Sequence, residues 1–142
     1  MTDSTSEQAK SFNQGIIDEF RANDGKTTGP FAGAPLTLIT ATGAKSGRQL
    51  TFPVVYTLDG DDVIVAASKA GAPTNPDWYH NLVANPEVTV ELPGETFQAR
   101  VEEAAGEERE RLFAAHAAAM PTFAEYAEKT SRVIPVLRLK RI

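Results

Sequence analysis

The stretch Thr40–Pro53, TATGAKSGRQLTFP, decides how the rest of the chain is interpreted. It separates two apolar runs, 36–39 and 54–56, and its basic part is bracketed by Gly43 and Gly47. Glycine permits backbone angles that a side chain forbids, so consecutive N–H groups can turn toward one bound anion. The stretch therefore predicts a loop between two strands that binds a phosphate or carboxylate group. A solvated hairpin loop with ordinary surface charges is the alternative.

The side chains of this loop favour an anion site and exclude two well-known phosphate loops. Lys45 and Arg48 carry positive charge, and Thr42 and Ser46 carry hydroxyl donors. A P-loop places its lysine directly after a glycine and continues into a helix, whereas Lys45 follows an alanine and the residues after Gly47 are typical of a strand. The Gly-x-Gly-x-x-Gly fingerprint of dinucleotide-binding folds is absent as well.

The composition is that of one globular domain. Of the 142 residues, 42% are hydrophobic and 23% are charged, enough to build a core without disulfide or metal staples. The chain has no cysteine, and its two histidines lie far apart in sequence, so we expect no metal site and no thiol nucleophile. The net charge of −5 disfavours nucleic acid and leaves a small anionic ligand as the partner of the basic loop.

No apolar run approaches the roughly 20 residues that a membrane span requires, and the polar N-terminus does not resemble a signal peptide. A cytoplasmic location is therefore expected. Phe12, Ile16 and Phe20 recur at four-residue spacing and predict an N-terminal helix. We expect this helix to pack on its own domain, with contact to a membrane surface, a partner or the substrate as the alternative. The chain is divided accordingly into an N-terminal helix and loop, 1–30, and a main domain, 31–142.

The hydrophobic pattern of the main domain predicts a mainly β protein with helices, of the α+β class. Alternating apolar residues, the Asp59-Gly60 turn and the helical composition after Gly106 mark the elements. Six strands are expected at 36–42, 51–58, 63–67, 88–92, 97–102 and 133–139, with helices between Asn75 and Asn85 and at 106–119 and 122–130. Consecutive antiparallel hairpins with helical excursions indicate a small six-stranded barrel whose openings the helices cover.

Several side chains receive a structural expectation. Asn75 is expected to cap the helix that Asn85-Pro86 ends. On that helix Trp78 is expected to face the core, and His80 is expected to be exposed. The charged end of the last strand, with Arg138, Lys140 and Arg141, is expected to form a solvated edge.

Three segments together resemble the deazaflavin-dependent nitroreductase family of actinobacteria, including mycobacteria. They are TGAKSGR at 42–48, VAASKAGAP at 65–73 and NPDWYHNLVANPEV at 75–88, and the IPV at 134–136 is similar too. The resemblance covers nearly everything from Leu36 to the C-terminus. It implies a split β-barrel like that of FMN-binding proteins, and it implies coenzyme F420, a 5-deazaflavin with a phosphate and an oligoglutamate tail, as the cofactor.

The resemblance also assigns cofactor-binding positions. The basic loop would hold the anionic tail, and the small residues after the third strand would lie along the deazaflavin ring. The implied residues are Lys45, Ser46, Gly47, Arg48 and Gln49 at the phosphate end, and Pro53, Ala66, Ala67, Ser68, Lys69, Trp78 and Asn81 around the ring. The family commonly has an arginine where this chain has Leu50, and the loss of one cation weakens binding by about 1–3 kcal/mol.

The implied chemistry is hydride transfer from the reduced ring to an electron-poor acceptor: a quinone, an enone or other activated C=C bond, or a nitroaromatic compound. Val55, Met120, Phe123 and Tyr126 are the implied acceptor contacts, and the last three can share one helix face. Tyr126 is the candidate proton donor, with Ser68 or solvent as alternatives. Nitroreducing members carry tyrosines at the positions of Met120 and Phe123, so a more apolar acceptor site is expected here.

Two other functions remain open from the residues. The phosphate loop would serve FMN equally well in a flavin-dependent reductase, and related barrels are thought to carry lipids or haem without turnover. The oligomeric state, monomer or homodimer, is also open. A peripheral position at a membrane would follow if the apolar stripe of the N-terminal helix were exposed.

Overall fold

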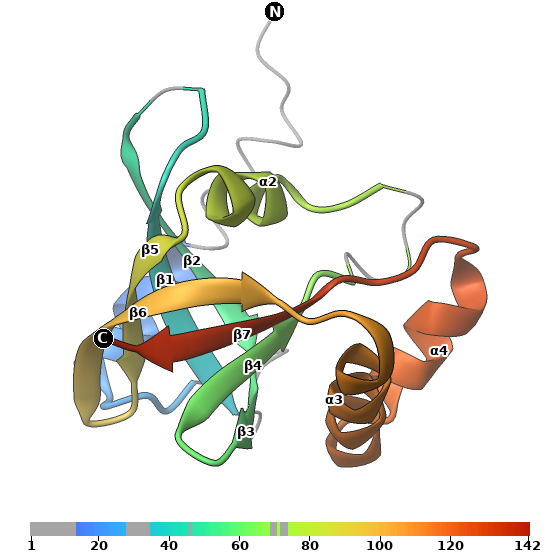
Figure 1. Cartoon of the computed structure of the whole chain (residues 1–142). Coiled ribbons are helices and arrows are strands. Elements are labelled where there is room, and N and C mark those ends of the chain that lie inside the picture. The colour runs from blue at the N-terminus through green and yellow to red at the C-terminus, as the bar shows by residue number, and fades with distance from the viewer. Residues whose placement is uncertain (1–13, 28–34, 46, 69–70, 72–73) are drawn as a thin grey trace, which may run out of the picture.

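The computed structural model describes residues 14–27, 35–45, 47–68, 71 and 74–142. Phe12, Ser46 and Lys69, which the sequence analysis singled out, lie outside the described residues. Seven antiparallel strands form one strongly curled sheet in the order β2-β1-β5-β6-β7-β4-β3 (Figure 1). The strands are β1 Leu36–Thr42, β2 Gln49–Val55, β3 Thr57–Asp59, β4 Asp62–Ala66, β5 Glu87–Leu92, β6 Glu95–Glu103 and β7 Val136–Arg141. The helices are α2 Asp77–Ala84, α3 Gly106–Ala119 and α4 Thr122–Lys129, and a further helical segment covers 14–22.

The sheet curls because one continuous stretch of chain serves both of its edges. β2 pairs with β1 and β3 pairs with β4, at opposite ends of the strand order, yet only Tyr56 separates β2 from β3. The single strand expected at 51–58 is therefore a strand that bends at Tyr56 and changes partners. This bend explains the seventh strand and confirms the split barrel.

The barrel interior is filled by the alternating residues that the sequence pattern predicts. Val63 and Val65 of β4 meet Leu137 and Leu139 of β7 in this core, and all four are fully buried. Helix α2 lies across one opening of the barrel (Figure 1). It contributes Leu82, which is also fully buried, and Trp78, whose ring stacks on that of Phe52 at 5.1 Å between centroids. His80 is exposed, as expected.

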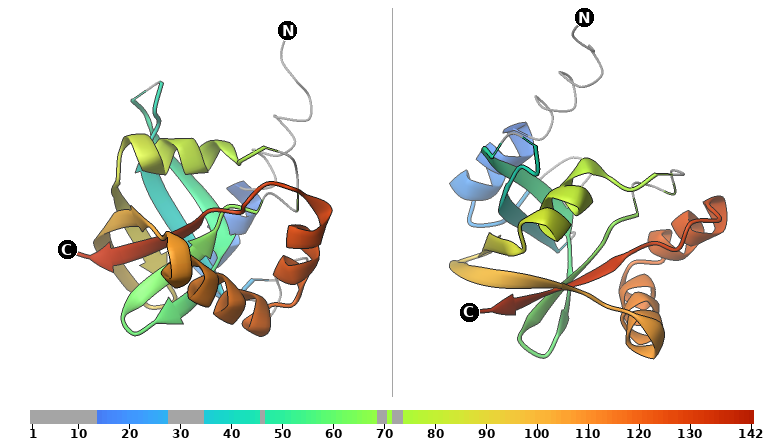
Figure 2. Two further views of the ribbon diagram at one scale, coloured as in Figure 1. Left: turned by 45° about the vertical axis from the view of Figure 1, so that its right-hand side comes forward. Right: turned by 45° about the horizontal axis from the view of Figure 1, so that its top comes forward.

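The outer face of the sheet is covered by three helical segments. Leu112 of α3 packs on Ile64 and Val136, and Phe123 of α4 packs on Ala66 and Ile134. Figure 2 shows the 14–22 segment beside β1, on the part of the sheet that α3 and α4 leave open.

The N-terminal segment packs on its own domain, as expected. Ile16, Ile17 and Phe20 are buried against Leu36 and Leu38 of β1. Ile17 was not in the predicted stripe. None of the described helices combines the length and the apolar character needed to cross a membrane.

One predicted helix cap is wrong. Helix α2 begins at Asp77 with Pro76 in the cap position, and no side chain caps it. The side chain of Asn75 instead accepts a hydrogen bond from Arg132, a partner 57 residues away that no local pattern indicates. The predicted end of the helix is confirmed, because Asn85 donates its backbone N–H to the Asn81 carbonyl and Pro86 follows.

The expectation of a solvated edge at Arg138 is also wrong. β7 lies between β6 and β4, so Arg138 is only 9% exposed. Its guanidinium lies 2.9 Å from Asp59, 2.7 Å from Asp62 and 2.7 Å from Glu108, which come from β3, β4 and α3. Arg111 and Arg138 lower the pKa of Asp59 from 3.8 to about 2 by hydrogen bonding to its carboxylate. This charge cluster joins the edge strand β3 and its neighbours β4 and β7 to α3.

Replacing Arg138 by methionine should lower the free energy of unfolding by about 2 kcal/mol at pH 7, because charge-assisted hydrogen bonds are lost and carboxylates face one another. The lowered pKa of Asp59 stabilises the fold fully above pH 4, and this contribution is lost as the pH falls toward 2. Urea unfolding from pH 7 to pH 2.5 should show a smaller loss on acidification in Arg138→Met than in the wild type. Arg100→Met is the control, since Arg100 is exposed and only 3.9 Å from Glu87. Equal stability of the two variants would contradict the assignment.

Candidate functional site

The basic loop between β1 and β2 is closed by its own backbone. Gly43 donates its N–H to the Arg48 carbonyl at 2.8 Å, and Gly47 donates to the Gly43 carbonyl at 3.0 Å. Gly47 has a φ of 72°, a left-handed conformation that favours glycine. The Gln49 amide donates to the Thr42 hydroxyl at 2.9 Å across the base of the loop. The strand-to-strand loop expected from the sequence is confirmed, and these bonds define its shape.

Helix α2 holds this loop from one side. Ala44 donates its N–H to Asn81 Oδ1 at 2.9 Å, and Asn85 Nδ2 donates to the Thr42 carbonyl at 3.2 Å. Asn81 and Asn85 are four residues apart and therefore lie on the same face of the helix. The two side chains fix the position of the loop relative to α2.

These bonds correct one part of the anion-site hypothesis. The N–H groups of Gly43, Ala44 and Gly47 were expected to turn toward an anion, but all three are donated to protein oxygens. The side chains of Lys45 and Arg48, both of which are exposed, remain as charged candidates for binding an anion at this loop.

A groove of about 650 Å³ lies between the loop and α2. Its lining residues are Gly43, Ala44, Lys45 and Leu50 from the loop and β2, and Asp77, His80 and Asn81 from the helix. Leu50 is 42% exposed, so the position where the family has an arginine faces the same groove as Lys45. The sequence analysis did not select Asp77 or His80 for the site. The four-residue spacing of Asp77 from Asn81 on a helix could have indicated that these two share a wall, whereas no such spacing relates His80 to Asn81.

The small residues after β4 form a second, buried part of the site. Ala66, Ala67 and Ser68 are 3%, 0% and 7% exposed. Ala67 donates its N–H to the Pro135 carbonyl at 2.9 Å, which fastens this ledge to the segment before β7. Here the ledge means residues 66–68. Pro53 lies half-buried on β2, an edge strand, which is where a sheet tolerates proline.

The implied acceptor contacts gather in one apolar cluster beside the ledge. Met120, Phe123 and Tyr126 pack around Ala66 together with Val55 of β2. The rings of Phe123 and Tyr126 meet edge to face at 5.5 Å. The three residues lie in one cluster, but they do not share one helix: Phe123 and Tyr126 belong to α4, whereas Met120 is the C-cap residue of α3.

His116 lies behind this cluster and was missed by the sequence analysis. It is fully buried, its Nδ1 lies 2.9 Å from the Thr57 hydroxyl, and its ring meets that of Phe123 at 4.4 Å. Burial lowers the pKa of His116 from 6.5 to about 4, so the imidazole is neutral at pH 7. Its spacing of four residues from Leu112 was the signal that it faces the sheet.

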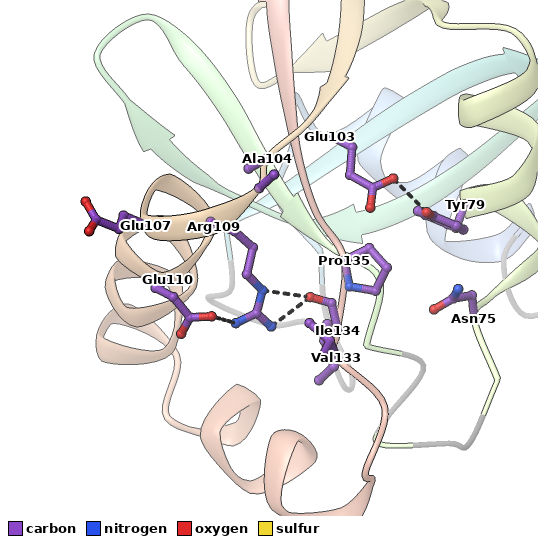
Figure 3. Close-up of a pocket in the computed structure, with 12 residues that line it drawn as sticks. Asn75, Tyr79, Glu103, Ala104, Glu107, Arg109, Glu110, Val133, Ile134 and Pro135 are labelled. Carbon is purple, nitrogen blue, oxygen red and sulfur yellow. Dashed lines mark hydrogen bonds and ion pairs between the residues drawn. The ribbon is translucent and has the colours of Figure 1, made fainter.

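A second hollow, of about 730 Å³, lies between the start of α3, the segment before β7 and Tyr79 of α2 (Figure 3). The Tyr79 hydroxyl donates to Glu103 at 2.6 Å, and desolvation together with this carboxylate raises the pKa of Tyr79 to about 12. Arg109 donates twice to the Ile134 carbonyl and pairs with Glu110. Three glutamates, Glu103, Glu107 and Glu110, line this hollow. Their charge disfavours an anionic ligand there.

Comparison with known proteins gives one consistent family. Residues 15–140 match the family model described as F420H(2)-dependent quinone reductase. The F420H(2)-dependent quinone reductase Rv1261c of Mycobacterium tuberculosis (strain ATCC 25618 / H37Rv) is 34% identical over 126 residues, which cover 86% of this chain and 85% of the relative. The solved structure of an F420-H2 dependent reductase, FDR-A, is 38% identical with a TM-score of 0.70 and covers 75% of this chain and 94% of its own. A structure described as a domain-swapped dimer is 33% identical with a TM-score of 0.72 and covers 97% and 100%.

Replacing Asn81 by alanine should release the Ala44 end of the loop from α2, while the bond from Asn85 to Thr42 stays. The lost hydrogen bond is worth about 1 kcal/mol, so the backbone amide of Ala44 should exchange with solvent about fivefold faster. Amide exchange followed by NMR measures this rate. Gln98→Ala is the control, because Gln98 makes a similar bond to Thr89 between β5 and β6. An unchanged rate at Ala44 in Asn81→Ala would show that the side chain does not hold the loop.

Proposed function

Since the chain belongs to the F420H(2)-dependent quinone reductase family, we propose that its own acceptor is a quinone reduced in the apolar cluster beside the ledge. The protein is an oxidoreductase, and its cofactor is coenzyme F420 in the reduced form. FMN-dependent chemistry and a non-catalytic carrier role, left open by the residues alone, are the weaker hypotheses. The observation that carries the proposal is the gathering of Val55, Met120, Phe123 and Tyr126 around Ala66.

The described residues fit an anionic deazaflavin in the groove. Lys45 lines its loop end opposite the single carboxylate of Asp77, and the exposed Arg48 lies on the same loop. The second hollow has three glutamates against one arginine. In our proposal the loop positions Lys45, Ser46, Gly47, Arg48 and Gln49 hold the phosphate and glutamate tail. The ring is held by the ledge, Lys69, Pro53, Trp78 and Asn81. When bound, reduced F420 supplies a hydride at its ring carbon.

The chain's own residues have three tasks in this reaction. The loop and α2 bind the tail. Their mutual hydrogen bonds hold the loop in place without the cofactor, so less conformational freedom is lost on binding. The ledge orients the ring against the acceptor cluster, where apolar side chains exclude water. Reduction of a quinone to a hydroquinone requires one hydride and one proton. We assign that proton to the Tyr126 hydroxyl, with Ser68 as the second candidate.

The apolar character of the cluster favours a quinone over other acceptors. Met120 and Phe123 offer no hydrogen-bond donor to a nitro group, whereas a flat quinone ring gains from contact with apolar and aromatic side chains. Enones and other activated C=C bonds remain secondary acceptors in this proposal. The oligomeric state is also a proposal, and the domain-swapped neighbour is compatible with a homodimer. A membrane contact through Ile16, Ile17 and Phe20 is not part of it, since β1 covers these side chains.

Removing both loop cations, with Lys45→Ala and Arg48→Ala combined, should raise the F420 dissociation constant about 10- to 30-fold. Two exposed cations contribute about 1 kcal/mol each to an anionic ligand. Quenching of Trp78, the only tryptophan in the sequence, reports the binding. Lys140→Ala with Arg141→Ala removes the same charge at the end of β7 and should leave the constant within twofold. Leu50→Arg should lower it, because the added guanidinium faces the same groove. Unchanged binding in the loop double variant would overturn the site.

Replacing Tyr126 by phenylalanine should slow quinone reduction about 10- to 100-fold at saturating cofactor, because a positioned acid is removed from the transition state. Single-turnover oxidation of F420H2 with a water-soluble quinone measures this rate. Tyr79→Phe is the matched control, since the Tyr79 hydroxyl is bound to Glu103 in the second hollow. A Tyr126→Phe rate within twofold of wild type would assign the proton to Ser68 or to solvent.

A further inference from the structure

Arg132 lies in the segment between α4 and β7 and is half-buried. Its guanidinium donates to the Ala67 carbonyl at 3.0 Å, to the Ser68 carbonyl at 2.8 Å and to Asn75 Oδ1 at 2.5 Å. These acceptors belong to two separate stretches of chain, the ledge and the approach to α2. One side chain therefore joins two walls of the proposed cofactor site, between which the described residues show no backbone hydrogen bond.

The approach to α2 matters because that helix carries the other cofactor contacts. Trp78 stacks on Phe52, which directly precedes Pro53 in β2. Asn81 accepts the hydrogen bond from Ala44 that holds the basic loop. Asn75 stands directly before Pro76 and the first turn of α2. A bond from Arg132 to Asn75 thus sets where α2 begins relative to the ledge.

Arg132 also sets the direction of the ledge peptides. Ala67 donates its N–H to Pro135 and offers its carbonyl to Arg132, so both of its backbone groups are used. The peptide between Ala67 and Ser68 is trans, so its N–H points opposite to the carbonyl that Arg132 holds. Within the described part of the chain, nothing accepts from the Ser68 N–H. By holding the Ala67 carbonyl, Arg132 therefore directs the Ser68 N–H away from itself. This N–H is the kind of hydrogen-bond donor that a ring carbonyl requires.

The contacts of Gly71 with Ser68 and with α4 restrict the movement of the ledge. Gly71 donates its N–H to the Ser68 carbonyl at 3.0 Å and has a φ of 82°. A Cβ at Gly71 would lie 2.9 Å from both Lys129 Cβ and the Tyr126 carbonyl of α4. The ledge exit is thus pressed against the helix that carries the acceptor contacts. A shift of the ledge would change the distance between ring and acceptor.

We propose that Arg132 is a positioning residue for hydride transfer, which fixes the ledge and the start of α2 in the geometry that aligns the deazaflavin ring with the acceptor cluster. The inference rests on the proposed function. Arg132 touches neither cofactor nor acceptor in this role and acts through Ala67, Ser68 and Asn75. A lysine does not replace it, because one ammonium group cannot present the planar fork that reaches three acceptors in two segments.

The test compares Arg132→Ala with Arg109→Ala. Arg109 is the control, since its guanidinium also donates two hydrogen bonds to the backbone, both to the Ile134 carbonyl. Its side-chain partners, Ile134 and Glu110, belong neither to the ledge nor to the approach to α2. F420 binding is followed by Trp78 quenching, and hydride transfer by single-turnover oxidation of F420H2. Arg132→Ala should weaken binding and slow transfer at saturating cofactor, each about tenfold, because a misaligned ring reacts slowly. Arg109→Ala should change both values less than twofold while losing thermal stability.

Chemical rescue separates positioning from general destabilisation. Millimolar guanidinium chloride should restore at least half of the lost transfer rate in Arg132→Ala, and methylammonium chloride should not. Arg132→Lys, which keeps the charge, should remain as slow as Arg132→Ala and serves in its place if the alanine variant does not fold. Normal transfer in Arg132→Lys, or a rate loss in Arg132→Ala equal to that in Arg109→Ala, would overturn the proposal.

The failure of this inference differs from failure of the proposed function. The loop variant Lys45→Ala with Arg48→Ala should weaken binding but keep the transfer rate at saturation, whereas Arg132→Ala changes both. If wild-type protein does not bind F420, the proposed function fails and Arg132 has no ring to position. If wild-type protein binds F420 and Arg132→Ala shows the same binding and the same hydride-transfer rate, only the proposed role of Arg132 is disproved.

Discussion

The structure depends on one strand that belongs to both edges of its sheet. The chain pairs with β1 up to Val55 and with β4 from Thr57 onward, so the sheet must curl until its edges meet. The bend at Tyr56 brings the two edges of the sheet together and so closes the barrel around its apolar core. Closure leaves the β1–β2 loop and α2 at one opening and turns the outer face of β4 toward α3 and α4. The groove, the ledge and the acceptor cluster are the result of this one change of partner.

Much of this architecture could be predicted from local pattern. The alternation of Val63 and Val65, or of Val88 and Val90, fixes which face of a strand is buried, and α3 has its predicted bounds from Gly106 to Ala119. The bend at Tyr56 was not predictable in this way, because the same alternating residues fit a straight strand. Arg138 was misjudged for a related reason. The sequence around Arg138 is typical of an exposed strand end. Only the structure shows that β7 lies inside the sheet and that three carboxylates surround Arg138.

The candidate site shows the same division. Lys45 and Arg48 could be selected because charge and glycine spacing lie within one short stretch. The partners of Ala44 and Asn75 could not, because Asn81 and Arg132 are 37 and 57 residues away. The burial of His116 was indicated only by its four-residue spacing from Leu112, and its contact with Phe123 of the next helix was not indicated at all. Family resemblance supplied the identity of the cofactor, which no pattern of charge and glycine contains.

The uneven charge of the molecule has a consequence for the kinetics of encounter. The chain carries a net charge of −5, and carboxylates line the hollow beside α3, while Lys45 and Arg48 stand at the exposed loop beside α2. An approaching polyanion is repelled by most of the surface and attracted at this one end. In the proposed mode of binding, the anionic tail of the coenzyme is therefore attracted to this end first, and the ring takes its place along the ledge afterward. The charge of the loop thus raises the rate of encounter with the coenzyme, and the barrel fixes the orientation of the bound ring.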